Sequence, residues 1–411
     1  MSSKINHESR GWPSQIIIES GFVPKWKGLK TISCPETAHC SLMTDHMQRF
    51  KQILVEEAAW DYPMTQRVLA RLPGVPVNII SDREALRPRE ATPAAWLGES
   101  KTTLLLAIQK GPFWRACPGT KDYICCGYQV LQVALNCPFD CSYCILQGYV
   151  NLPAVTVFVN VEDLQTELAA RWAEEPGRVW RLGTGEFGDS LALDELTGLH
   201  ETLVPLIARH PQAILEIKSK WHHLEHLLPL GPNSQVIFAW SLNPPELIRE
   251  VEHFAASLEA RLKAAQRAAT AGFRVAFHFD PIIFFPGWEE AYRRTVERLG
   301  NVISAADVAW ISLGVLRFMP PLRQIIFSRF PESSLGSEEM VRAPDGKLRY
   351  FKNLRVEMYG RLREWLAEVL PGVQLYLCME SPRVWREVFG FAPEGEELAR
   401  LLDDRLFPKG P

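Results

Sequence analysis

The 411-residue sequence has no stretch of about 20 uninterrupted apolar residues, so no part of it is expected to cross a membrane as a helix. It also lacks a basic excess: 45 Lys and Arg stand against 48 Asp and Glu, a formal net charge of -3. Any nucleic-acid partner must therefore be held by a local patch rather than by the field of the whole protein. The N-terminal residues Met-Ser-Ser-Lys-Ile-Asn-His-Glu do not form a signal peptide, and no repeat or low-complexity tract occurs. What remains is an ordinary globular composition, 47% hydrophobic and 23% charged.

Cysteine occurs nine times, and three of the cysteines share one short motif, Cys137-Pro-Phe-Asp-Cys141-Ser-Tyr-Cys144. The spacing is C-x3-C-x2-C, and no second pair at zinc-like spacing follows it. Three thiolates can hold three irons of a four-iron cluster and leave the fourth open, whereas cysteine caps every iron in a ferredoxin. Buried structural thiols are the alternative, but the strand-like run 128–135 before the motif favours a cofactor loop. Because thiolates awaiting iron oxidise readily, we expect the protein in a reducing cytoplasm.

This motif, with an aromatic residue directly before its third cysteine, resembles that of the radical S-adenosylmethionine (SAM) enzymes. In that class SAM chelates the open iron, and one electron cleaves it to methionine and a 5′-deoxyadenosyl radical. The resemblance implies a 4Fe–4S cluster on Cys137, Cys141 and Cys144, with SAM as the second cofactor. It also implies a reductant such as flavodoxin or ferredoxin.

Beyond the motif, short apolar runs alternate with helix-like stretches, which predicts βα units around a parallel sheet. The runs are apolar throughout, so both faces of each strand should be covered. The fold class expected is α/β, with a partial (β/α) barrel whose site lies at the carboxyl ends of its strands. Strands are expected at 155–160, 179–184, 213–218, 236–242, 274–281, 308–316 and 374–379, and helices at 163–175, 193–208, 246–271 and 288–299.

The domain organisation predicted from these runs is an N-terminal arm (1–49), a small α/β domain (50–127), the barrel (128–390) and a C-terminal tail (391–411). In the small domain, strands are expected at 50–56, 75–81 and 102–108, and a helix at 64–72. The arm carries a loose group of metal-ligating residue types whose spacing matches no standard site: Cys34, His39, Cys40 and His46.

From about residue 50 to 390 the sequence resembles the spore photoproduct lyase family, whose members split a thymine–thymine lesion in DNA. The stretches that carry the resemblance are Tyr143-Cys-Ile-Leu-Gln147, Lys218-Ser-Lys-Trp221 with 224–228, Trp240-Ser-Leu-Asn243, 276–281 with 287–292, and Phe330-Pro-Glu-Ser333 with the hairpin after it. Two positions depart from the family. Glu186 stands where the lyase has a hydrogen-donating cysteine, and Ile145 replaces a tyrosine of its radical relay, of which only Tyr143 remains. A carboxylate cannot replace a thiol as hydrogen-atom donor, because its O–H bond is much the stronger.

Four residues at strand ends are candidates for binding SAM. Thr184-Gly185-Glu186 resembles the Gly-Gly-Glu strand end of many radical SAM enzymes, in which the carboxylate accepts from the SAM ammonium. By the same resemblance, Lys220 contacts the SAM carboxylate and Ser241 a polar end of SAM, with Asn243 a weaker candidate. The alternatives are a solvated glutamate in a glycine-rich turn and a surface lysine.

Cys378 closes the last strand-like run and could point into the barrel as an alternative hydrogen donor. A buried structural cysteine is the competing interpretation, and it also applies to Cys125 and Cys126.

A hairpin is expected around Asp345-Gly346, within a segment (340–355) that we call the basic hairpin. Its predicted nucleic-acid contacts are Arg342, Lys347, Arg349 and Lys352, with Arg355 adding charge and Tyr350 and Phe351 available to stack on bases. A simple solvated hairpin is the alternative.

Three functional hypotheses follow. The first is a DNA-lesion lyase related to spore photoproduct lyase, with Tyr143 and Cys378 as catalytic residues. The second is a radical SAM enzyme with another substrate on the same scaffold, which the changes at Glu186 and Ile145 favour. The third is a cluster-bearing nucleic-acid-binding protein without turnover.

Overall fold

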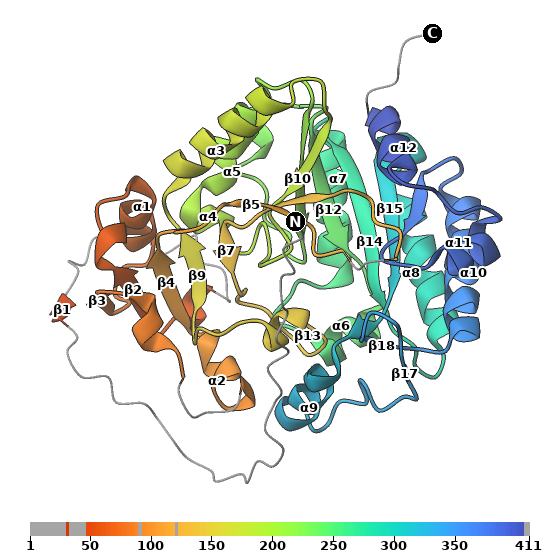
Figure 1. Ribbon diagram of the computed structural model, residues 1–411, viewed down its shortest axis with the longest axis horizontal. Coiled ribbons are helices and arrows are strands. Elements are labelled where there is room, and N and C mark those ends of the chain that lie inside the picture. Colours follow the sequence, from red (N-terminus) through yellow and green to blue (C-terminus); the bar gives the residue numbers. More distant parts are fainter. Residues whose placement is uncertain (1–29, 33–46, 89–92, 120–121, 407–411) are drawn as a thin grey trace, which may run out of the picture.

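The computed structural model describes residues 30–32, 47–88, 93–119 and 122–406 (Figure 1). Two sheets form its framework, a six-stranded sheet in the order β1-β3-β2-β4-β9-β7 and an eight-stranded sheet in the order β19-β15-β14-β12-β11-β10-β6-β5. No helix in these ranges is both long and apolar enough to cross a membrane. The loose Cys34, His39, Cys40 and His46 group lies outside the described residues.

The first sheet contains the three strands expected in the N-terminal domain and three more. Its parallel strands are β3 (Val77–Ile80), β2 (Gln52–Glu56), β4 (Thr103–Ala107) and β9 (Val155–Phe158), with β1 (Lys30–Ile32) and β7 (Ala134–Leu135) antiparallel at the edges. Helices α1 (Pro63–Arg71) and α2 (Pro93–Ser100) belong to this part of the chain. The prediction of 155–160 as a barrel strand was wrong, because β9 pairs with β4. The chain therefore returns to the first sheet after the cysteine motif, across the boundary expected at residue 127.

The second sheet is the expected partial barrel. Its parallel strands are β6 (Gln129–Leu131), β10 (Trp180–Gly183), β11 (Ala213–Ser219), β12 (Val236–Ser241), β14 (Arg274–Ile282), β15 (Val308–Val315) and β19 (Leu375–Leu377), and β5 (Trp114–Ala116) is antiparallel at one edge. Every residue of β12 and β15 is buried, as expected for strands covered on both faces. The larger helices along this part of the chain are α3 (Val161–Glu174), α5 (Leu199–Ile207), α7 (Leu258–Thr270), α8 (Trp288–Val302), α10 (Lys352–Val369), α11 (Pro382–Phe389) and α12 (Glu397–Leu406).

The edge strands β5 and β19 do not pair with each other, so the barrel stays open. The segment between β5 and β6 crosses this gap. Ile124 donates its backbone N–H to the carbonyl of Glu380, just beyond β19, at 3.0 Å.

The single helix predicted over 246–271 is two helices with a short strand between them. The helix α6 (Pro245–Val251) ends before β13 (Glu252–His253), and α7 begins after Ser257, whose hydroxyl accepts from the Ala260 amide at 3.2 Å. Phe254 between them has a φ of 67°. A side chain in this left-handed region interrupts a helix, and the interruption frees β13 to pair elsewhere.

The carboxyl ends of the barrel strands, which we call the barrel mouth, face the lower edge of Figure 1. There β13, α6, helix α9 (Pro320–Arg329) and the hairpin strands β17 (Val341–Arg342) and β18 (Leu348–Arg349) gather. The hairpin is joined to the barrel because β16 (Arg317–Phe318), directly after β15, pairs with β18.

Candidate functional site

The cysteine motif forms a loop (137–144, the cluster loop) that is held by backbone pairing. Within it, β8 (Asp140–Cys141) pairs antiparallel with β13, which sets Cys141 opposite Glu252. The Ser142 amide donates to the Val251 carbonyl at 2.9 Å. The loop therefore depends on the helix break at β13, which lies more than 100 residues later in the sequence.

Two of the three thiols, Cys137 and Cys141, lie in an environment that disfavours their charged form. Cys141 is buried, and Cys137 and Cys144 are partly buried. Burial raises the pKa of Cys137 to about 12 and holds the pKa of Cys141 well above its ordinary value. Bound iron would offset the cost of ionising these buried thiols, because cysteine binds a metal as the thiolate and the metal cation stabilises that negative charge.

The donor set fits a cluster. The described part of the chain contains no group of three His, Cys, Asp or Glu side chains arranged around a single ion. A four-iron cluster does not require such a group, because each of its thiolates binds a different iron.

Beneath the cluster loop, a buried carboxylate organises a polar network. Glu252 accepts from the Tyr143 hydroxyl and from the Asn243 amide (2.9 Å), and Arg261 pairs with its other oxygen at 2.5 Å. Tyr292 in turn donates to the Asn243 side-chain oxygen at 2.8 Å. Burial alone would raise the pKa of Glu252, but the charges of nearby Arg261 and Lys220 hold it below its ordinary value.

This network places two of the predicted site residues. Tyr143, the expected relay residue, and Asn243, an expected SAM contact, are both buried and bonded to Glu252. Ser241 is buried too, and its carbonyl accepts from Arg261 at 2.9 Å. Sequence reasoning missed Glu252 and Arg261, because both lay inside the stretch taken as one continuous helix.

At the ends of β10 and β11, charged groups line the barrel mouth. Lys218, rather than Lys220, pairs with Glu186, at 3.1 Å. Desolvation would lower the pKa of Lys218, but Glu186, Asp280 and Glu216 raise it above its ordinary value. Lys220 lies with its ammonium 5.7 Å from the centre of the Tyr143 ring, and its backbone N–H donates to Asp189 at 2.7 Å.

Gly185 is required by the neighbouring strand. A Cβ at this position would come within 2.8 Å of the Lys218 carbonyl oxygen. The close contact at this glycine is therefore with β11.

Cys378 follows β19, the edge strand of the barrel sheet. The Arg317 guanidinium is 3.3 Å from its sulfur and also pairs with Asp280 at 3.3 Å. Burial and the neighbouring Asp280 hold the pKa of the Cys378 thiol well above its ordinary value, although Arg317 opposes them. The thiol therefore stays protonated at neutral pH. Sequence reasoning missed Arg317, which no motif marks.

The basic hairpin differs from the expected row of exposed cations. Arg349 is 1% exposed, pairs with Asp345 at 2.7 Å and lies 4.4 Å from the ring of Tyr123. Arg355 is also buried, and it pairs with Glu380 at 2.9 Å. The expectation that all the basic side chains face a phosphate backbone is corrected for these two, whose charges are compensated inside the protein.

The other three cations of the basic hairpin are more accessible. Lys352 is partly exposed and pairs with Glu387 at 2.6 Å, and Lys347 is partly buried beside Asp345 at 3.8 Å. Arg342 is exposed.

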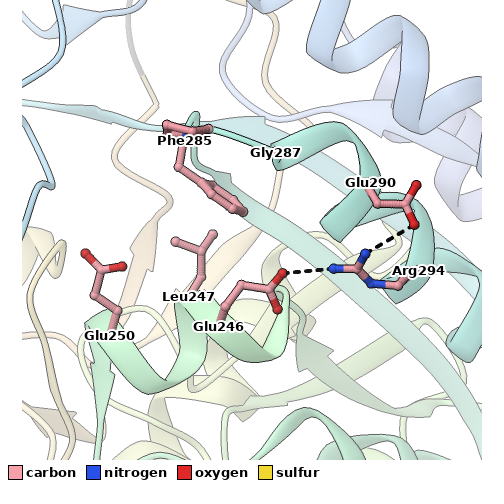
Figure 2. Close-up of a pocket in the computed structure, with 8 residues that line it drawn as sticks. Glu246, Leu247, Glu250, Phe285, Gly287, Glu290 and Arg294 are labelled. Carbon is pink, nitrogen blue, oxygen red and sulfur yellow. Dashed lines mark hydrogen bonds and ion pairs between the residues drawn. The ribbon is translucent and has the colours of Figure 1, made fainter.

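A surface groove of about 460 Å³ lies between α6 and the start of α8 (Figure 2). Arg294 bridges Glu246 (3.2 Å) and Glu290 (3.1 Å) there, and Glu250 adds a third carboxylate. None of the predicted site residues lines it. Its carboxylates would repel a phosphate backbone, so we assign it no part in the site.

Comparison with known proteins identifies the family. The family model described as spore photoproduct lyase matches residues 49–375. The chain belongs to the spore photoproduct lyase family. It is 24% identical to spore photoproduct lyase of Geobacillus sp. (strain Y412MC61) over 338 residues, which cover 79% of this chain and 97% of the relative. It is also 24% identical to the Bacillus subtilis (strain 168) protein over 296 residues, 71% and 85% of the two chains.

Solved structures of spore photoproduct lyase share the fold. A mutant lyase matches with a TM-score of 0.71 at 23% identity, covering 80% of this chain and 98% of that one. Another mutant, with bound AdoMet and dinucleoside spore photoproduct, matches with a TM-score of 0.70 at 22% identity and the same coverage. The expected family and the partial-barrel fold are confirmed. The expected cofactors, a 4Fe–4S cluster and SAM, are those of this radical SAM family.

Proposed function

We propose that this protein is a radical SAM lyase that cleaves a carbon–carbon bond in a DNA lesion, with Cys378 as its hydrogen-atom donor. The observation that carries the proposal is the position of the Cys378 thiol, after the last barrel strand and 3.3 Å from Arg317. This thiol supplies the S–H group that the Glu186 position lacks.

The protein offers residues that suit both cofactors. Cys137, Cys141 and Cys144 would hold the cluster, which together with SAM supplies a 5′-deoxyadenosyl radical when both are bound. Of the four SAM candidates, Ser241 and Asn243 are committed to the buried network. We therefore assign the SAM ammonium to Glu186 and its carboxylate to Lys220, two charged side chains at adjacent strand ends.

Cys378 would act after the lesion bond breaks. Its S–H bond breaks homolytically, the hydrogen atom forms a C–H bond with the product carbon radical, and the unpaired electron stays on sulfur. A thiolate cannot do this because it carries no hydrogen, so the raised pKa of Cys378 matches the role. Arg317 and Asp280 would hold the sulfur in place.

The rim of the mouth suits a nucleic-acid substrate. Helix α9 lies between the two loops of the site. Ile325 packs against the group of Leu97, Leu146 and Val150, the last two of which follow the cluster loop, and the Met319 methyl comes within 3.8 Å of a Cβ placed on Gly346 of the basic hairpin. Several exposed large apolar side chains belong to the segments around this rim, and they include Ile145, Tyr149, Met319, Phe327, Val341 and Phe351. Such side chains stack on or wedge between bases, while Arg342 and Lys347 can reach phosphates.

A second candidate is a radical SAM enzyme with a different substrate. The Glu186–Lys218 pair favours it, because a lyase-type donor at this position would leave Lys218 without its nearest carboxylate. In either case a small reductant such as flavodoxin or ferredoxin would supply the electron.

The test is anaerobic reconstitution followed by dithionite, SAM and an oligonucleotide carrying spore photoproduct. Restored thymine together with 5′-deoxyadenosine or SAM turnover supports the lyase, and Cys378→Ala should abolish repair while SAM cleavage persists. SAM cleavage without repair would favour the second candidate. A loaded cluster without SAM cleavage would indicate a protein that binds but does not turn over.

A further inference from the structure

A buried lysine from the N-terminal domain reaches the back of the cluster loop. Lys101, between α2 and β4, is 3% exposed. Its ammonium donates to the Asn136 side-chain oxygen at 2.6 Å and to the Cys137 carbonyl at 2.9 Å. Among the described residues, no carboxylate lies within ion-pair distance of it.

Asn136 fixes this contact. Its φ is 71°, and its side-chain oxygen also accepts from the Cys137 amide at 2.9 Å. Its amide group donates to Ser100 (3.1 Å) and to the Ala154 carbonyl (3.2 Å). The backbone N–H and C=O of Cys137 are thus held by Asn136 and Lys101, and the ammonium has little freedom to turn away.

An ammonium in such a place requires an explanation. A lysine is rarely this buried unless it is paired, because removing the charge from water is costly. Lys101 has only neutral acceptors in contact. A cluster on Cys137 would place negative charge close to this ammonium, because Lys101 contacts the Cys137 carbonyl, each of the three thiolates carries one negative charge, and reduction adds another.

We propose that Lys101 is the internal counter-ion of the cluster and raises its reduction potential. This inference rests on the proposed function, because it requires the cluster on Cys137. A fixed positive charge stabilises the reduced cluster, which is the more negative form, relative to the oxidised cluster. Asp189 opposes this effect at the same thiol, and Lys220 adds positive charge on the side of Cys141. Through Lys101, the N-terminal domain thus influences how easily the cluster accepts an electron.

The test is a redox titration of the reconstituted protein followed by EPR, after iron and sulfide contents have shown that the cluster is loaded. Lys101→Met removes the charge, Lys101→Gln keeps a donor without charge, and Lys101→Arg keeps the charge. Lys110→Met is the matched control, because Lys110 lies on the surface beyond β4 and pairs with Asp82 at 2.8 Å.

At the potential that half-reduces the wild type, the ratio of reduced to oxidised cluster should fall about tenfold in Lys101→Met and Lys101→Gln, or ~59 mV for one electron. The estimate assumes a charge within about 10 Å at an effective dielectric constant of about 20. Lys101→Arg and Lys110→Met should stay within about threefold of the wild type by the same estimate.

Unchanged ratios in loaded Lys101→Met and Lys101→Gln proteins would overturn the proposal. These two variants could fold without assembling a cluster. In that case, cluster assembly in Lys101→Arg supports the counter-ion. If Lys101→Arg assembles no cluster either, the site requires the shape of lysine rather than its charge, and the proposal is overturned. A wild type that assembles no cluster would overturn the proposed function as well. A wild type that loads but repairs no lesion leaves this test intact.

Discussion

The cluster loop and the basic hairpin lie at the same barrel mouth, yet their ionisable groups are compensated in opposite ways. In the cluster loop, three thiols are held in a poorly solvated site, and the buried Lys101 behind them contacts only neutral acceptors. In the basic hairpin, Arg349 and Arg355 are surrounded by Asp345 and Glu380. A cluster bound as proposed would supply the missing charge partner in the cluster loop, whereas Arg349 and Arg355 in the hairpin already have theirs.

This difference distinguishes residues suited to binding a ligand from residues that stabilise the fold. A buried group without a partner is costly, so it persists where a ligand supplies the partner. A buried, paired charge is instead most sensitive to loss of that partner. Substitutions in the two regions should therefore change different observables.

The largest effect is expected at the thiols. Alanine at Cys137, Cys141 or Cys144 should abolish the visible absorption and the EPR signal of the reduced cluster, because each thiolate would hold a separate iron. Cys378→Ala is the control and should load normally. A protein with all three residues replaced that still bound about four irons would contradict the assignment.

Next in size is the carboxylate beneath the cluster loop. Glu252→Gln leaves the Arg261 guanidinium buried and unpaired, which should reduce the free energy of unfolding by about 3–5 kcal/mol at pH 7. The pKa of Glu252 is lowered in the folded protein, so its contribution is present above its ordinary pKa and is lost as pH falls through the folded value. Denaturant melts from pH 7 to pH 3 should show the two proteins converging towards acid pH. A constant difference over this range would contradict the lowered pKa.

In the hairpin, Arg349→Met should also destabilise the fold by about 3–5 kcal/mol, because Asp345 would lose its closer cation and keep the more distant Lys347, at 3.8 Å. Arg342→Met, an exposed change of the same kind, should stay within about 0.5 kcal/mol of the wild type. Urea denaturation of both variants measures the contrast. Equal stabilities would show that Arg349 is not the internal residue described here.

A smaller effect is expected on SAM affinity. Glu186→Gln should weaken SAM binding by about 1.5–3 kcal/mol, the range for a hydrogen bond to a charged group, with the iron content unchanged. Equilibrium binding to the loaded protein measures it, with the distant Glu246→Gln as control. Unchanged affinity would remove Glu186 from the SAM site.

The smallest effect is expected at the hairpin surface. If Arg342 contacts a phosphate, Arg342→Ala should reduce the slope of log affinity against log salt by about 0.9 on duplex DNA. Fluorescence anisotropy at several salt concentrations measures the slope. If the wild type shows no salt-dependent binding, the nucleic-acid assignment of the rim fails.

The local features of this protein were predictable from the sequence. The C-x3-C-x2-C motif is one short loop whatever surrounds it, and apolar runs such as β12 and β15 are covered on both faces because they have no polar side to expose. The resemblance to spore photoproduct lyase rests on such contiguous stretches, and the family match confirms it.

Pairing between distant segments was decided only in three dimensions. The sequence of β9 is compatible with a strand of the barrel and with a strand of the first sheet. Only its pairing with β4 shows that it belongs to the first sheet. Charge shows the same limit. Arg342 and Arg349 are equivalent in the sequence, but Asp345 and Tyr123 fold around one of them and not the other. Because the energy of a charge depends on its solvation and its neighbours, the sequence determined which groups are ionisable, and the tertiary structure decided which of them still lack a partner.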